Sequence, residues 1–191
     1  MAACLALVLI CIPAITHFFG PSQMDDPYRQ GIEYSVNSIW DLPAEYNGKI
    51  LAQNLELTEN AQIDLYYNED GSAENAGDRF SLIVKDTVFS ETDTVIIGGN
   101  EAKKAEKELL LHCFFDGRTA EEQKVDMVFT KDATKTLEIN CVAVQIAPNV
   151  NSLGFEHYYY AVFEYDGIVY DVRTRSNDPN YIYEVLDQLL K

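Results

Sequence analysis

The spacing of apolar residues divides the chain into two unlike parts. From Ala2 to Phe19 the apolar side chains follow one another, and the only polar side chains among these 18 residues are Thr16 and His17. A helix of this length extends about 27 Å, close to the roughly 30 Å of the hydrocarbon core of a bilayer. An amphipathic core helix would have a polar face, which this stretch lacks. We therefore expect the protein to interact with a membrane through residues 2–19.

Beyond this segment, apolar and polar residues alternate with the period of half-buried strands. Ile32, Tyr34 and Val36 alternate with polar residues, and Asp41-Leu42-Pro43 ends this first predicted strand. Further predicted strands, bounded by turn-forming residues, cover residues 49–57, 62–67, 79–85 and 94–97. Gly98-Gly99 is predicted to be a turn.

The second half of the chain predicts more strands and one ambiguous segment. Residues 125–130 and 135–146 are expected to form a hairpin around the turn 131–134. The apolar face changes over near Val142, which predicts a strand covered on both sides. Residues 101–111 form either a helix capped by Asn100 or, from residue 108 onward, a strand that runs to Phe115.

The C-terminal residues predict an amphipathic helix. Asp178 is its expected N-cap and Pro179 its first residue. The apolar positions follow a helical spacing and are Ile182, Val185, Leu186 and Leu189. Together these elements predict a β-dominated α+β fold of antiparallel sheets, sandwich-like or strongly curved, with a C-terminal helix and an N-terminal hydrophobic membrane segment before it.

The segment 157–175 carries the clearest hairpin signal, an Asp166-Gly167 pair between two alternating runs. If that pair is a two-residue turn, the residue numbers of opposed partners add up to 333. One face of this hairpin is then predicted to pack into the core. On the other face Tyr160 then lies opposite Arg173 and Tyr158 lies opposite Arg175. We expect cation–π or stacking contacts between these exposed pairs.

Two adjacent cations beside aromatic rings in an acidic domain predict a binding site for a carboxylate, a sugar or the acidic strand of a protein partner. The candidate residues are Tyr158, Tyr160, Arg173, Arg175 and the neighbouring His157. The alternative is a solvated sheet face with ordinary cross-strand pairs. Another alternative is a small secreted hydrolase, in which His157 works with Asp171 or Glu164, and a third is a structural cell-envelope domain without a ligand.

Charge separates the two parts of the chain as sharply as hydropathy does. The chain has 31 acidic and 14 basic residues, a net charge of −17, and residues 1–24 contain none of them. So acidic a chain is not expected to bind nucleic acid. We expect residues 1–22 to be a membrane anchor or signal segment, 23–30 a linker and 31–191 an extracytoplasmic β-rich domain. Residues 25–191 then lie outside the cell membrane, or are secreted if the leader is cleaved at the small-x-small site Gly20-Pro21-Ser22.

The cysteine residues of the folded part indicate at most one disulfide. Cys113 and Cys141 either form one disulfide or remain buried free thiols. The sequence has no CxxC or CxxH spacing, so no metal site is predicted, and no cofactor is expected.

The ending YAVFEYDGIVYDVRTRSNDPNYIYEVLDQLL resembles the closing module of the extracellular C-terminal domains of Gram-positive membrane-anchored anti-sigma-factor-like proteins and lipoproteins. The matching positions are Asp166, Gly167 and Tyr170 in the strand pair, then Glu184, Leu186 and Leu189 in the helix. The resemblance implies a membrane helix before an outer domain and carries no catalytic residue. The expected function is thus a membrane-anchored or exported bacterial domain of binding or sensory type, the outer part of a regulatory membrane protein.

Overall fold

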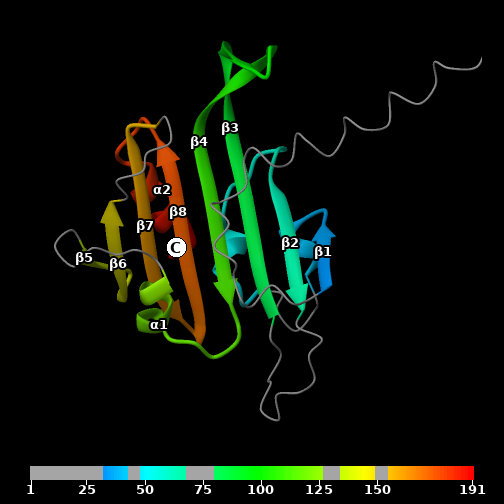
Figure 1. Ribbon diagram of the computed structural model, residues 1–191. Helices are drawn as coiled ribbons and strands as arrows, with labels where there is room; N and C mark the ends of the chain where they lie inside the picture. Colours follow the sequence, from blue (N-terminus) through cyan, green and yellow to red (C-terminus); the bar gives the residue numbers. More distant parts are fainter. Residues whose placement is uncertain (1–31, 43–47, 68–79, 127–133, 149–154) are drawn as a thin grey trace, which may run out of the picture.

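The computed structural model describes residues 32–42, 48–67, 80–126, 134–148 and 155–191. They form one eight-stranded antiparallel sheet of order β1-β2-β3-β4-β8-β7-β6-β5 (Figure 1). Its strands are β1 (Ile32–Val36), β2 (Gln62–Tyr67), β3 (Phe80–Ile97), β4 (Asn100–Phe114), β5 (Lys135–Ile139), β6 (Val142–Pro148), β7 (His157–Tyr165) and β8 (Ile168–Ser176). The predicted β-dominated class is confirmed, with a single sheet in place of the several expected.

The membrane segment expected at residues 2–19 lies outside the described residues. Within the described ranges, no helix is long and apolar enough to cross a membrane.

Two meanders of four strands meet in the middle of the sheet. The chain runs from β1 to β4, crosses to the far edge at β5, and returns through β6 and β7 to β8. β8 then pairs with β4, from Lys107 opposite Ser176 to Phe114 opposite Val169. This long-range pairing joins the two halves of the chain.

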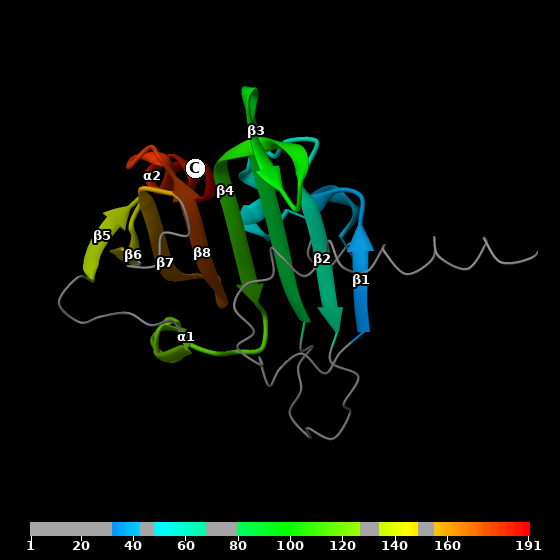
Figure 2. The same ribbon diagram turned by 45° about the horizontal axis from the view of Figure 1, so that its top comes forward.

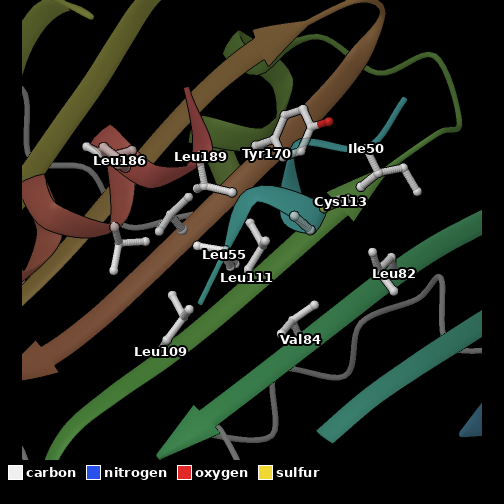
Figure 3. Close-up of a cluster of buried hydrophobic side chains, with 14 of the residues drawn as sticks. Ile50, Leu55, Leu82, Val84, Leu109, Leu111, Cys113, Tyr170, Leu186 and Leu189 are labelled. Carbon is white, nitrogen blue, oxygen red and sulfur yellow. The ribbon is translucent and has the colours of Figure 1, made fainter. Parts of the chain in front are cut away.

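One face of the sheet carries the hydrophobic core. It is covered by the C-terminal helix α2 (Tyr181–Leu189) and by the 3₁₀ turns η1 (Ile39–Asp41) and η2 (Leu51–Asn54). Figure 3 shows side chains of β3, β4 and β8 pointing toward Leu186 and Leu189 of the helix and toward Ile50 and Leu55 beside η2. All four predicted apolar positions of the helix are buried, because they form one stripe that packs on the sheet.

The opposite face carries the short helix α1 (Ala120–Asp126), on the other side of the sheet from α2 (Figure 2). The sequence prediction missed this helix, although its start is a capping box. The backbone N–H of Thr119 donates to Glu122, and the N–H of Glu122 donates to the Thr119 hydroxyl. The strand predicted at residues 125–130 is wrong at its start, since Val125 and Asp126 end this helix, and 127–133 lie outside the described residues.

Three other local predictions are corrected by tertiary pairing. Residues 49–57 contain the 3₁₀ turn η2, not a strand, because Ile50, Ala52 and Leu55 all turn into the core. Of the two alternatives for residues 101–115, the helix is wrong and the strand is confirmed, although β4 begins earlier than residue 108, and its pairing with β3 is irregular only around residues 89–94. The expected strand 135–146 is a hairpin, because Asn140 and Cys141 adopt positive φ angles of 49° and 66° and reverse the chain.

The helix α2 begins later than predicted. Its N-cap position is Asn180, and Asp178 precedes the helix, where its carboxylate accepts the N–H of Asn180. The Gly98-Gly99 turn is confirmed, since both glycines have positive φ and Ile97 pairs with Asn100 across them.

Candidate functional site

The β7–β8 hairpin has the register that the Asp166-Gly167 turn predicts. Tyr165 pairs with Ile168, and the pairing continues to His157 opposite Ser176. Tyr160 lies opposite Arg173 and Tyr158 opposite Arg175, on the face away from the core. We call these four residues the arginine–tyrosine face.

Both predicted cation–π contacts are present on this face. The guanidinium carbon of Arg173 lies 5.5 Å from the ring centre of Tyr160, and that of Arg175 lies 4.7 Å from the ring centre of Tyr158. The expectation that all four side chains are exposed is wrong, because Tyr158 is only 8% exposed. Burial and a hydrogen bond with Tyr158 raise the pKa of Tyr160 to about 12. The Tyr160 ring therefore stays neutral beside Arg173.

Arg173 is held by a fully buried carboxylate. Its Nη2 lies 2.7 Å from Oδ2 of Asp171, its Nε lies 3.1 Å from Oδ1, and the side chain of Asp171 is 0% exposed. Burial by itself lowers the pKa of Arg173, but the charge of Asp171 outweighs burial and raises that pKa above its usual value. Arg173 is thus a fixed cation with its acidic partner beneath it.

The Asp171 carboxylate is also tied to α1. The side-chain amide of Gln123 donates to Asp171 at 3.0 Å, and its carbonyl oxygen accepts from Nη1 of Arg118 at 2.6 Å. Arg118 in turn pairs with Asp116 and lies 3.7 Å above the ring of Phe114. A continuous polar chain therefore links the loop before α1 to Arg173.

Arg175 is held far more loosely than Arg173. Its Nη1 donates to Oε2 of Glu108 on β4 at 3.1 Å, and both side chains remain about a quarter exposed, at 24% and 22%. The difference between the two pairs therefore lies in the carboxylates, since Glu108 is reached by solvent and Asp171 is not.

The structure does not bring His157 together with its expected partners. His157 stacks on Tyr159, on the core side of β7, with 6.2 Å between ring centres. Asp171 and Glu164 lie on the other face, and Glu164 is seven residues away along the same strand. The acid–base arrangement expected for a hydrolase is absent from these positions.

The two cysteines of the domain are free thiols and not a disulfide, but the expectation that both thiols are buried is wrong for Cys141. Cys113 is buried in the core on β4, whereas Cys141 is exposed in the β5–β6 turn. Burial, with a smaller contribution from the charge of Asp171, raises the pKa of the Cys113 thiol well above its usual value.

A shallow cavity of about 300 Å³ lies elsewhere, between the β5–β6 edge and α2, and its lining includes Tyr159, Tyr183 and Lys135. None of the four residues of the arginine–tyrosine face lines it. Within the described part of the chain, no group of three or more His, Cys, Asp or Glu side chains is arranged to hold a metal ion.

No family model matches the chain, and comparisons with curated proteins and with solved structures found no similar protein.

Proposed function

We propose that this chain is a membrane-anchored or exported protein of Gram-positive bacterial type, whose β-rich domain binds a ligand that bears a carboxylate at Arg175 on the arginine–tyrosine face. The observation that carries the proposal is the contrast between the two arginines of this face. Arg173 is locked on Asp171, whereas Arg175 shares an exchangeable, partly exposed pair with Glu108. The ligand is a small anion, an acidic sugar or an acidic segment of a protein.

The rest of the site favours binding over catalysis. The Asp171, Gln123 and Arg118 network orients Arg173 without exposing an acid, because Asp171 is fully buried. The ring of Tyr158 packs against the guanidinium of Arg175, a contact that limits the motion of this donor of hydrogen bonds to a carboxylate. Such a preorganised donor lowers the entropic cost of binding.

The binding role is tested by titrating the full chain in detergent micelles with oligogalacturonate and, in parallel, with a neutral oligosaccharide of equal length. The Nε–H resonances of the arginines are followed by NMR. We expect Arg175 to shift with the acidic probe, and Arg175→Gln to weaken binding about tenfold, which corresponds to roughly 1.4 kcal/mol.

Lys135→Gln is the matched control, because Lys135 is an exposed cation on the edge strand β5 and lies away from the face. Equal binding by Arg175→Gln and Lys135→Gln would exclude the face as the ligand site.

The location outside the membrane is supported by the partition of charge. Residues 1–24 carry no charged side chain, whereas residues 25–191 hold the entire net charge of −17. A regulatory protein with this arrangement would sense its ligand outside the cell and transmit binding through the leader.

Cys141 provides a direct test of this location, since it is an exposed thiol of the folded domain. A maleimide that does not cross membranes should label Cys141 in intact cells as fully as in lysed cells. Labelling only after lysis would place the domain inside the cell.

A further inference from the structure

Strand β5 forms one edge of the sheet, and its outer side has no strand beside it in the described part of the chain. It pairs only with β6, from Lys135 opposite Ile146 to Ile139 opposite Val142. Figures 1 and 2 both show β5 at the end of the sheet, beyond β6. The peptide N–H and C=O groups that face away from β6 can bond with one more strand. This edge therefore suits the backbone of an extended segment.

Two common protections of an edge strand are missing from β5. The strand contains no proline, and its register with β6 is continuous from residue 135 to residue 139, without a bulge. A partner strand can therefore pair with β5 along its whole length.

The apolar side chains of β5 are incompletely covered. Leu137 and Ile139 pack against the core on the face that carries α2, but both are only partly buried. A further strand beside β5 would cover the parts of these side chains that solvent still reaches. The hydrophobic effect thus favours pairing at this edge, in addition to the hydrogen bonds of the backbone.

The two edges of the sheet differ in charge. Residues 135–148 form the β5–β6 hairpin and hold one cation, Lys135, and one anion, Glu138, whereas the other edge strand β1 has Glu33 as its only charged residue. Two copies of a chain with a net charge of −17 repel each other least where the local charge is zero, because salt screens distant charges over about 8 Å. Local charge therefore favours β5 as the contact between two copies.

The symmetry of a pair of copies restricts its register. Two antiparallel edge strands are related by a twofold axis perpendicular to the sheet, so opposed residues lie on the same face and their numbers differ by zero or by an even number. An axis at Leu137 opposes this residue to its own copy and Thr136 to Glu138, and it pairs all five residues of β5. An axis at Glu138 would oppose two carboxylates, which destabilises a strand pair.

We propose that two copies of this chain associate through their β5 strands, antiparallel and with Leu137 on the twofold axis. The eight-stranded sheets of the two copies then form one continuous sheet. The Leu137 side chains meet on the face that carries α2, and on the other face each Thr136 hydroxyl can donate to Glu138 of the second copy. This inference does not depend on which ligand binds to the arginine–tyrosine face.

The register is tested by disulfide crosslinking of the full chain in detergent micelles. Cys4, Cys11 and Cys141 are first replaced by Ser, which leaves the buried Cys113. Opposed residues have Cα atoms about 4.5–5.5 Å apart, within the range of a disulfide, whereas a residue next to the axis lies about 8 Å from its own copy, which is too far. We expect Leu137→Cys to form linked dimers roughly tenfold faster than Thr136→Cys or Glu138→Cys.

The two slow variants should crosslink rapidly when they are mixed, because Thr136 of one copy lies opposite Glu138 of the other. Glu164→Cys is the control for random collision, since Glu164 is exposed on β7. Far-ultraviolet circular dichroism confirms that each variant keeps its strands. Equal rates at all three positions of β5, or rates no higher than that of Glu164→Cys, would overturn the proposal.

Charge at Thr136 provides a second test that leaves Leu137 intact. Thr136 is exposed in the single copy, so its substitution should affect folding little. Thr136→Glu should weaken the association roughly tenfold and Thr136→Lys should strengthen it to a similar degree, as measured by sedimentation, because each change acts twice against Glu138. Thr92→Glu and Thr92→Lys are matched controls on an exposed residue of β3. Equal shifts at both positions would mean that net charge, and not the β5 edge, determines the association.

Discussion

Asp171 and Arg173 lie two residues apart on the same face of β8, and the buried carboxylate of the first holds the guanidinium of the second at 2.7 Å. The pair spans the boundary between interior and surface, because Asp171 is fully buried and Arg173 is partly exposed. It also connects β8 to α1 through Gln123. This pair therefore connects the orientation of Arg173 to the interior of the domain and to α1.

The coupling within this pair can be measured with a double-mutant cycle. Asp171→Asn removes the charge beneath Arg173, and we expect it to lower the free energy of unfolding by about 1–3 kcal/mol. Arg173→Gln leaves Asp171 buried without its cation and should have a similar effect. The double variant should lose less than the sum of the two, as measured by urea unfolding. Strict additivity would show that the pair does not act as a unit.

Acid should weaken the contact between Asp116 and Arg118. Burial raises the pKa of Asp116, but hydrogen bonds and the charge of Arg118 outweigh it and hold that pKa below its usual value of 3.8. A lowered carboxylate pKa contributes stability that is present above the unfolded pKa and is lost as the pH falls through the folded pKa. Asp116→Asn should therefore destabilise the domain well above pH 3.8 and have almost no effect well below it.

Urea unfolding across this pH range measures the effect of Asp116→Asn. In an Arg118→Gln background the pH dependence of the effect should shrink, because the partner that lowers the pKa is gone. A constant effect at every pH would contradict the assignment.

Tyr170 joins the centre of the sheet to the 3₁₀ turn η2. Its hydroxyl accepts the backbone N–H of Leu51 at 3.2 Å, while its ring stacks on Phe163. Tyr170→Phe keeps the ring and removes the acceptor, so we expect a loss of about 1 kcal/mol in the free energy of unfolding. The matched control is Tyr165→Phe, which removes an exposed hydroxyl and should change stability little.

The difference in stability between wild type and Tyr170→Phe should depend on pH in the alkaline range. Burial raises the pKa of Tyr170 above its usual value of 10.0. A raised tyrosine pKa contributes stability that is present below the unfolded pKa and is lost as the pH rises toward the folded pKa. The difference in the free energy of unfolding between wild type and Tyr170→Phe should thus become smaller above pH 10.0. An unchanged gap would show that the hydroxyl ionises as freely in the folded state as in the unfolded state.

The two thiols of the domain should differ sharply in reactivity. Cys141 is exposed and should react at once with iodoacetamide in the folded protein, whereas Cys113 is buried and has a raised pKa. We expect Cys113 to react only when the domain unfolds, so its rate should follow the urea concentration. Peptide mapping by mass spectrometry separates these two cysteines from Cys4 and Cys11. Rapid labelling of Cys113 in the native state would contradict its position in the core.

Local patterns predicted the parts of the fold in which a turn sets the pairing. Asp166-Gly167 determined every partner in the β7–β8 hairpin, including both arginine–tyrosine pairs, because a two-residue turn leaves one register. The spacing of the C-terminal apolar residues likewise identified the buried stripe of α2. Thr119 and Glu122 carry a capping-box signal for α1, whereas the spacing of apolar residues does not indicate this short helix.

Other features depended on contacts that no short segment contains. The change of apolar face near Val142 is the result of a turn at Asn140 and Cys141, and the periodicity alone described a doubly covered strand equally well. His157 was adjacent to acidic residues in sequence, yet the alternation of β7 places it on the core side.

The sequence by itself determined the acidic, strand-rich character of the domain, the tight hairpin at Asp166-Gly167 and the amphipathic C-terminal helix. These depend on interactions between near neighbours, which composition and spacing specify. Only the tertiary structure decided that β4 pairs with β8 and that Glu108 and Asp171 neutralise the two arginines unequally. Each of these depends on partners far apart in the chain, whose meeting is set by the packing of the whole sheet.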